Sequence, residues 1–260
     1  MYNYIYNLEK KWNNNSSMSS LSNINELSDI NNKEFSVLNY NDDEFIVYSS
    51  KNEKNQKITI GYKENIVCVV FLLDLLNLCA HLQLLDKFRK CKKDNKYPTS
   101  EDINKMVSFC IEFSKKSGMK CITLEDRASL ICKKNGKTYT AKLSDYYLLK
   151  KYNSYYGHKF GFVLENKMNQ RIFLEDVKKL RKTKIKDVDW EKIRKHIEND
   201  DEYGEWSDLL RKISKNRLLK TLLEKMGDKF CSIMDLLIIN IMKELNITTL
   251  RGQIFIKYIR

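Results

Sequence analysis

Cysteine pairs and histidine clusters are absent from this sequence. Its seven cysteines, an odd number, include no pair spaced as CxxC, and its three histidines (His81, His158 and His196) are scattered. A zinc finger needs several such ligands at short, regular spacing, so we expect no metal site. The odd cysteine count also predicts reduced thiols without a disulfide framework, as in an intracellular protein.

Long apolar segments are missing as well. The most hydrophobic run, Ile66–Leu78, is interrupted by Asp74 and Asn77. It is shorter than the roughly 20 residues that a membrane-spanning helix needs, and we interpret it as a buried strand that passes into a helix. The first eleven residues lack the apolar core of a signal peptide. The sequence therefore predicts a cytoplasmic protein without a transmembrane segment.

Positive charge, in contrast, is in excess. The chain has 47 Lys and Arg against 34 Asp and Glu, a formal net charge of +13. Such an excess favours contact with polyanions, among them nucleic acid, the phosphates of a nucleotide cofactor and anionic membranes. Lys, Asn and Ile are abundant throughout while proline occurs once, so an ordinary solvated surface gives the same count. Charge alone leaves the partner open.

Composition divides the chain into three parts. Residues 1–34 form a low-complexity arm rich in Asn and Ser, with too few apolar positions to offset the entropy of ordering. Residues 35–165 alternate short apolar runs with turn signals, which predicts an α/β domain. Residues 166–260 show apolar positions at helical spacing, which predicts an all-helical C-terminal domain.

The fold class predicted for residues 35–165 is α+β, with a mixed, mostly antiparallel sheet flanked by helices. Four strands of an antiparallel meander are expected at FSVLN, EFIVYS, KITIGY and NIVCVVF. The leucines after Phe71 predict a helix. A second helix is expected from Glu101 to Lys116, followed by a buried parallel or central strand at Cys121–Leu124.

Turn and helix signals continue beyond that strand. Asn135-Gly136 lies between two apolar runs and predicts a type I′ hairpin. The spacing of tyrosines and leucines predicts an aromatic helix over Leu143–Tyr156, and Phe162–Leu164 is expected to be the last strand.

The order of these elements resembles that of a known family. Between Met119 and Phe162, a strand ends in the acidic turn Glu125-Asp126, and a hairpin and a tyrosine-rich helix then lead into Phe160-Gly161-Phe162. This order resembles the second half of the GNAT family of N-acetyltransferases, especially the divergent members found in large DNA viruses. The resemblance implies an acetyl-CoA-dependent transferase acting on an amine, in a host cytoplasm or a virion.

The resemblance also implies where the cofactor binds. In this family a splayed pair of central strands admits acetyl-CoA, backbone amides hold its carbonyl group, and its pyrophosphate lies at a helix N-terminus, where free N–H groups favour an anion. Here that helix begins near Ser100 and Asn104, and Asn153 is assigned to the same cofactor.

The helix start departs from the family pattern. Residues 97–104 read YPTSEDIN and contain no glycine, whereas the family has a glycine-rich turn here. Glu101 and Asp102 in the first turn repel a phosphate, and a role as ordinary helix-capping carboxylates explains them better.

Catalytic roles follow from the same resemblance. Tyr156, or Tyr155 as the second choice, is expected to act as general acid toward the departing thiolate. Glu125 or Asp126, at a strand end, is expected to accept the proton of the amine, directly or through water. The ordinary alternatives are tyrosines packed against a sheet and an aspartate that caps a turn.

Two other functions stay open at this point. The first is an inactive acetyltransferase-like scaffold that binds nucleic acid or serves viral assembly, with Lys178–Lys186 as a basic contact; that segment is also explained as a solvated linker. The second is a docking stripe for a partner protein at Leu218, Leu222, Leu223 and Met226, although intramolecular core is the preferred explanation of this stripe.

Overall fold

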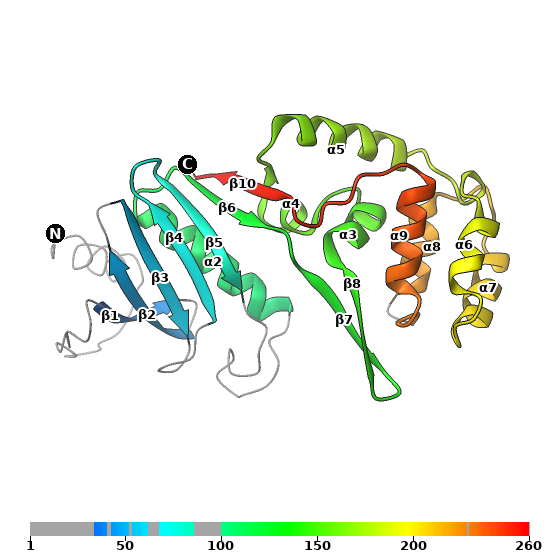
Figure 1. Cartoon of the computed structure of the whole chain (residues 1–260), viewed down its shortest axis with the longest axis horizontal. Helices are drawn as coiled ribbons and strands as arrows, with labels where there is room; N and C mark the ends of the chain where they lie inside the picture. Colours follow the sequence, from blue (N-terminus) through cyan, green and yellow to red (C-terminus); the bar gives the residue numbers. More distant parts are fainter. Residues whose placement is uncertain are drawn as a thin grey trace. The chain divides into compact units, whose positions relative to one another are not determined.

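The computed structural model of the chain (Figure 1) describes residues 34–40, 43–51, 54–61, 68–85, 100–227 and 229–259. The predicted N-terminal arm lies outside the described residues, apart from Glu34. The described chain has an α+β fold, with a mixed, mostly antiparallel sheet and flanking helices. This coarse part of the predicted fold class is confirmed.

The described elements have the following bounds. The strands are β1 (Glu34–Tyr40), β2 (Asp43–Lys51), β3 (Asn55–Gly61), β4 (Val69–Asp74), β5 (Cys79–Leu85), β6 (Cys121–Glu125), β7 (Ser129–Lys134), β8 (Lys137–Lys142), β9 (Val163–Leu164) and β10 (Ile254–Tyr258). The helices are α2 (Ser100–Lys116), α3 (Leu143–Lys151), α4 (Tyr155–Phe160), α5 (Lys167–Leu180), the 3-10 helix η2 (Ile185–Asp187), α6 (Trp190–Ile197), α7 (Tyr203–Lys212), α8 (Leu219–Met226) and α9 (Met234–Glu244).

The chain forms two compact units. The first ends at Leu124 and resumes at Ile256, and the second runs from Glu125 to Phe255. The larger sheet has the strand order β1-β2-β3-β4-β5-β6-β10-β9, and β7 pairs with β8 in a separate ribbon. None of the described helices is long and apolar enough to cross a membrane.

The first unit begins with the antiparallel meander that its apolar runs predict. β1 to β5 pair in sequence order, and each neighbouring pair is antiparallel. Side chains alternate between buried and more exposed along β3 and β4, as expected for strands with one face on the core. The four predicted strands are confirmed.

The helix predicted after Phe71 is wrong, because β4 continues to Asp74 and a second strand, β5, follows. The Asp74 carboxylate accepts from the N–H groups of Leu76 and Asn77, at 3.0 Å each, and so closes a tight turn. Leu78 leaves the turn in the left-handed region, at φ 54°. The leucines that suggested a helix are therefore divided among two strands and the turn between them.

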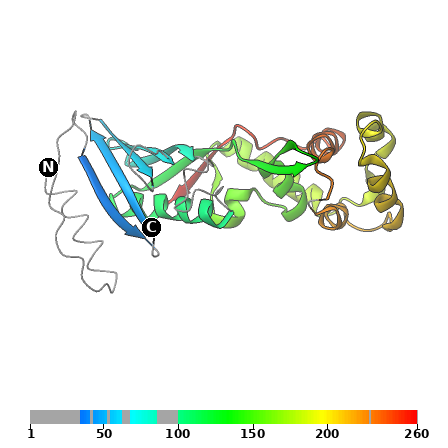
Figure 2. The same cartoon turned by 90° about the horizontal axis from the view of Figure 1, so that it is seen from below.

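α2 and β6 follow the sequence prediction. α2 is the crossover between β5 and β6, which pair in parallel. It covers one face of the sheet (Figure 2). Phe109 lies 4.9 Å from Phe45 between ring centroids, and Phe113 meets Phe71 edge-on at 5.4 Å. The core of the first unit lies between this helix and the sheet.

The second unit contains the predicted hairpin. Asn135 (φ 50°) and Gly136 (φ 74°) both adopt the left-handed region between β7 and β8, as a type I′ turn requires. Glycine or asparagine accepts this conformation with little strain.

The predicted aromatic helix over Leu143–Tyr156 is interrupted. α3 ends at Tyr152, which is left-handed at φ 57°, and α4 restarts at Tyr155. The Ser154 hydroxyl accepts from the Gly157 N–H at 2.8 Å and caps the new helix. Two helices therefore stand where the tyrosine spacing predicts one, because a serine cap competes with helix continuation.

The C-terminal segment is helical over α5 to α9, but the prediction that it is entirely helical is wrong at Ile254–Tyr258. This run of β-branched and aromatic residues forms β10, which lies between β6 and β9 in the sheet. Because β10 follows β9 in the chain, the prediction that Phe162–Leu164 is the last strand is also wrong. The Glu165 N–H, next to β9, donates to the Ile254 carbonyl of β10 at 3.0 Å.

The proposed docking stripe on α8 belongs to the core. Leu222 and Leu223 are fully buried and Met226 is 1% exposed, while Leu218 is half-buried. The intramolecular explanation of this stripe is confirmed.

The prediction that the cysteines are reduced is wrong, because the structure contains disulfides. Cys79 is bonded to Cys121 on the neighbouring parallel strand, and Cys132 on β7 is bonded to Cys231. The two cysteines of each pair are 42 and 99 residues apart in the sequence, so no short cysteine spacing indicates these bonds. Cys110 is a free, buried thiol whose pKa is raised by burial.

We expect Cys132→Ser to lower the free energy of unfolding by about 2–5 kcal/mol, because the bond closes a long loop in the unfolded chain. Urea denaturation measures this difference. With a reductant, which also opens the Cys79–Cys121 bond, the wild-type protein and the variant should be equally stable. Equal stability of the two proteins without reductant would contradict the Cys132–Cys231 bond.

Candidate functional site

The parallel pair of the first unit opens at its carboxyl end. Pairing between β5 and β6 begins at Cys79↔Cys121 and ends at Leu82↔Leu124. β5 nevertheless continues to Leu85. Beyond Leu82, this strand keeps its partner β4 on one side, while its parallel pairing with β6 has ended. Among the described residues, the pairing of β5 with β6 therefore stops three residues before β5 ends.

A β-bulge lies at the same end of β5. Val70 pairs with Leu84 and Phe71 pairs with Leu82, so Gln83 is an extra residue opposite two consecutive residues of β4. A bulge bends the strand and leaves one residue out of the ladder, and bulges are frequent beside active sites. The cysteine pair Cys79–Cys121 holds the opposite, amino end of the parallel strands together.

Two of the predicted cofactor residues belong to α2. Ser100 is its first residue and Asn104 lies in the second turn. In a helix of 17 residues the first N–H groups have no intrahelical partner, so this end offers donors to an anion. Glu101, in the first turn, is exposed and adds one negative charge there.

Asp126, at the start of the second unit, is a buried carboxylate. Its side chain is 2% exposed, and its Oδ1 accepts from the Ala128 N–H at 3.1 Å. Burial raises the pKa of this carboxyl from 3.8 to about 6, and the nearby Asp145 carboxylate adds to the increase. The Ala128 N–H and the positive charge of Arg251 act in the opposite direction.

The surroundings of Asp126 come from distant parts of the chain. The Asp126 N–H donates to the Gln253 carbonyl at 3.0 Å, and the Gly252 N–H donates to the Asp126 carbonyl at 2.7 Å. Asp145, 1% exposed, accepts from the Thr249 hydroxyl and the Leu250 N–H at 2.7 Å each. Residues 249–253 therefore enclose two acidic residues that sequence reasoning alone did not connect.

The structure brings Tyr156 close to Asp126. Burial raises the pKa of the Tyr156 phenol above its ordinary value, and the Asp126 carboxylate is the next largest cause. The Tyr156 ring lies 6.3 Å from that of Phe162 and 6.0 Å from that of Phe255, between centroids. Its phenol stays protonated at neutral pH.

The second-choice acid, Tyr155, belongs to the same aromatic cluster. Its ring meets Tyr156 at 5.4 Å and Tyr147 at 5.1 Å, both edge-on. Burial raises its pKa as well, with Tyr147 as the second cause. No effect of Asp126 on Tyr155 is resolved, so Tyr156 is the stronger candidate.

Glu125 lies outside this cluster. Its carboxylate pairs with the Arg127 guanidinium at 2.8 Å, and both side chains are exposed. A solvated ion pair between near neighbours is an ordinary surface feature. Of the two predicted proton acceptors, only Asp126 is placed beside a candidate acid.

Asn153, the third predicted cofactor residue, lines a cavity of about 320 Å³. The cavity wall is mostly apolar, and its lining residues are Tyr152, Asn153, Ser154, Gly157, Gly161, Phe162, Val163, Leu164, Gln170, Phe173, Leu174, Val177, Arg181 and Phe255. Tyr156 does not line the cavity, but its ring packs against two rings that do. The volume is at the lower end of the range for ligand pockets.

Two polar side chains in the cavity wall differ in their hydrogen bonding. The Asn153 side-chain oxygen accepts from the Ser154 N–H at 2.9 Å, which leaves the amide N–H groups for a ligand. The Tyr152 hydroxyl is buried and has no hydrogen-bond partner among the described residues.

No family model, curated protein or solved structure matches this chain. Among the described residues, no group of three or more His, Cys, Asp or Glu side chains could hold a metal ion.

We expect Asp126→Asn to stabilise the fold above pH 6. The folded chain binds the Asp126 proton more tightly than the unfolded chain, so ionisation of this carboxyl weakens the fold as pH rises from about 4 to above 6. Removing it should raise the free energy of unfolding at pH 7.5 by about 1–3 kcal/mol. Glu125→Gln, at an exposed neighbour, is the control. Identical pH dependence of the variant and the wild type would contradict the burial of this charge.

Gly157→Ala tests the packing of the α4 start. A Cβ atom there would lie 2.5 Å from Asn153 Oδ1, 2.7 Å from Ser154 Oγ and 3.1 Å from the Phe162 carbonyl oxygen. We expect a loss of roughly 1–3 kcal/mol in the free energy of unfolding. Gly204→Ala on α7, where a Cβ meets nothing within 4 Å, should leave stability unchanged or higher. Equal effects of the two substitutions would contradict this packing.

Proposed function

We propose that the protein is a divergent GNAT-type enzyme that transfers an acetyl group from acetyl-CoA to an amine. The observation that carries the proposal is the pair formed by Asp126 and Tyr156. A carboxyl group with a pKa near neutrality stands close to a phenol that stays protonated. Catalysis of proton transfer at neutral pH requires one group that is ionised and can accept a proton, and a second group that is still protonated and can donate one.

The donors present in the first unit fit the cofactor. The family resemblance implies a splayed central strand pair, and the early end of the β5–β6 register and the bulge at Gln83 support it. Backbone N–H groups of β5 near Gln83 would hold the thioester carbonyl, and the N-terminus of α2 near Ser100 and Asn104 would hold the pyrophosphate. When bound, acetyl-CoA supplies the acetyl group as a thioester, whose bond to sulfur breaks as the bond to the amine nitrogen forms.

Asp126 is the proposed base. Its carboxylate, ionised above pH 6, accepts the proton that the amine nitrogen loses, directly or through a water molecule. Burial is the main reason that the pKa of this carboxyl is about 6; the nearby Asp145 carboxylate raises it further and the charge of Arg251 lowers it.

Tyr156 is the proposed acid. It donates its proton to the departing sulfur, and burial keeps the phenol protonated at neutral pH, so that the proton is present when the sulfur leaves. The cavity lined by Asn153 is large enough for a small amine or the acyl end of the cofactor. A cytoplasmic location for the enzyme stays a prediction, and its disulfides make the redox state in the cell a direct check.

Calorimetry with acetyl-CoA, together with a thiol-release assay over a panel of amines, tests the proposal. We expect wild-type protein to bind acetyl-CoA, and Tyr156→Phe and Asp126→Asn to retain binding while turnover falls by about 10²–10⁴-fold. In the wild type, kcat/KM should fall as pH drops below about 6, because Asp126 becomes protonated.

Glu125→Gln and Tyr155→Phe are the matched controls, and both should keep most of the turnover. Loss of turnover in Glu125→Gln alone would move the base to Glu125. Absence of acetyl-CoA binding would favour the alternative, an acetyltransferase-like scaffold without catalytic activity.

A further inference from the structure

Two basic segments of the second unit lie side by side. Residues 178–186 contain six Lys and Arg, residues 211–220 contain five, and neither segment contains Asp or Glu. They are separated in the sequence by α6 and most of α7. The sequence alone singled out only residues 178–186. The interpretation of that segment as a solvated linker is wrong, because the segment is folded within one unit.

Backbone hydrogen bonds join the two segments. The Ile185 N–H donates to the Arg217 carbonyl and the Lys186 N–H donates to the Lys215 carbonyl, both at 2.9 Å. An isolated antiparallel bridge pairs Lys184 with Leu218. The cations of both segments are therefore held at fixed spacing along one short, paired stretch of backbone.

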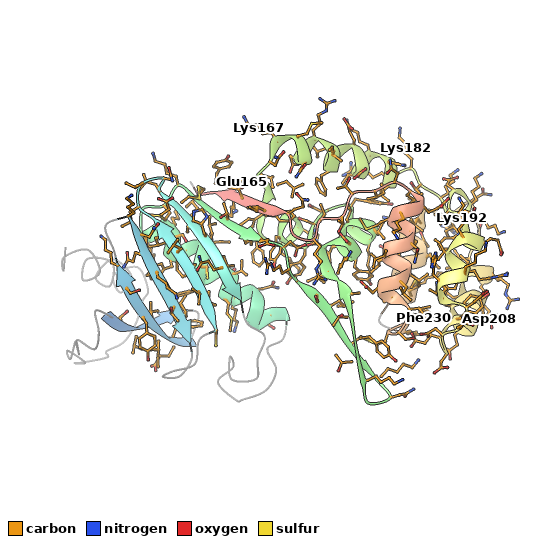
Figure 3. All side chains as sticks on the ribbon, viewed as in Figure 1. Glu165, Lys167, Lys182, Lys192, Asp208 and Phe230 are labelled. Atoms are coloured by element: carbon orange, nitrogen blue, oxygen red, sulfur yellow. A yellow bond between two sulfur atoms is a disulfide. The ribbon has the colours of Figure 1, made fainter. Side chains whose placement is uncertain are left out.

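Buried residues anchor this paired stretch. Thr183 and Ile185 are 6% and 0% exposed, and Leu219, on the other segment, is 1% exposed. Lys182 and Lys186 flank the anchors in the first segment, and both are exposed. Lys182 projects outward beyond the end of α5 (Figure 3). Buried and exposed residues therefore alternate along this stretch. The exposed lysines face solvent, and the buried side chains hold the backbone in place.

Most of this charge is not neutralised within the protein. Among the described residues, Lys182, Lys186, Lys215 and Arg217 make no ion pair, and all four are exposed. Arg211 is paired with Asp208, and the Asp187 carboxylate accepts from the Lys184 backbone N–H. Unpaired cations at fixed positions lower the entropy lost when a polyanion binds.

The face also lacks the apolar residues that a membrane surface would require. None of the large hydrophobic side chains that are exposed among the described residues belongs to either segment. Amphipathic helices that bind membranes insert apolar side chains beside their lysines, and this face has none to insert, whereas binding to a phosphate backbone needs charge alone. The chemistry therefore favours a phosphodiester chain.

We propose that residues 178–186 and 211–220 form a basic face that binds the phosphate backbone of nucleic acid without reading its sequence. Lysine and arginine contacts to phosphates position a protein on nucleic acid but carry no base information. This proposal does not rest on the acetyltransferase activity.

The experiment measures binding of the full chain to a short labelled DNA duplex by fluorescence anisotropy at several salt concentrations. The test variant combines Lys182→Gln, Lys186→Gln, Lys215→Gln and Arg217→Gln. The control variant, with the same change in net charge, combines Lys137→Gln, Lys151→Gln, Lys159→Gln and Lys167→Gln, all exposed positions of the same unit.

We expect wild-type affinity to fall steeply with salt, and the test variant to lose about 3–4 from the slope of log affinity against log salt. The control variant should keep the wild-type slope within about 1. Thermal melting confirms that both variants are folded. Equal losses in the two variants, or no wild-type binding, would overturn the proposal.

Vesicles containing phosphatidylserine provide the competing anionic surface. Weak binding that is unaffected in the test variant supports the nucleic-acid assignment. Binding as tight as that to DNA, and lost in the test variant, would assign the face to a membrane surface instead.

Discussion

The parallel pairing of β5 with β6 is the constraint on which the first unit depends. Two adjacent parallel strands cannot be joined by a tight turn, so the chain must cross over the sheet, and α2 makes this crossover. The crossover provides the helix whose phenylalanines Phe109 and Phe113 cover the sheet. It also directs the helix N-terminus and the carboxyl ends of β5 and β6 toward the same edge, where ligands of α/β sheets commonly bind.

The second unit is organised around buried negative charge. Placing Asp126 and Asp145 almost completely out of solvent is unfavourable unless polar partners surround them. The Thr249 hydroxyl and the Leu250 N–H supply partners for the Asp145 carboxylate, and the Ala128 N–H supplies one for Asp126, whose backbone is bonded to Gly252 and Gln253. A carboxylate held in this way has a pKa that the surrounding structure sets, and groups of this kind are over-represented at functional sites. The same burial that weakens the fold at neutral pH makes Asp126 suitable for proton transfer.

Sequence reasoning succeeded where the determinants are local and failed where they are distant. Asn135-Gly136 specifies its hairpin within two residues, and the apolar face of α2 is visible in one window. β5 was mistaken for a helix because leucine suits both states and the Asp74 turn has no glycine or proline to mark it. Asp126 and Tyr156 were found through the order of elements. The neighbours of Asp126 at residues 249–253 were not, because only the folded chain brings them within reach.

The position of β10 affects how the chain can fold while it is being made. β10 lies between β6 and β9 in the sheet, yet the ribosome reaches it about 130 residues after β6. At ordinary rates of about 5–20 residues per second, roughly 6–26 seconds of synthesis separate the two strands. During that interval the backbone groups of β6 that will bond to β10 have no partner and can pair with another nascent chain. The late-arriving strand therefore leaves an open sheet edge at β6 until residues 254–258 have been made.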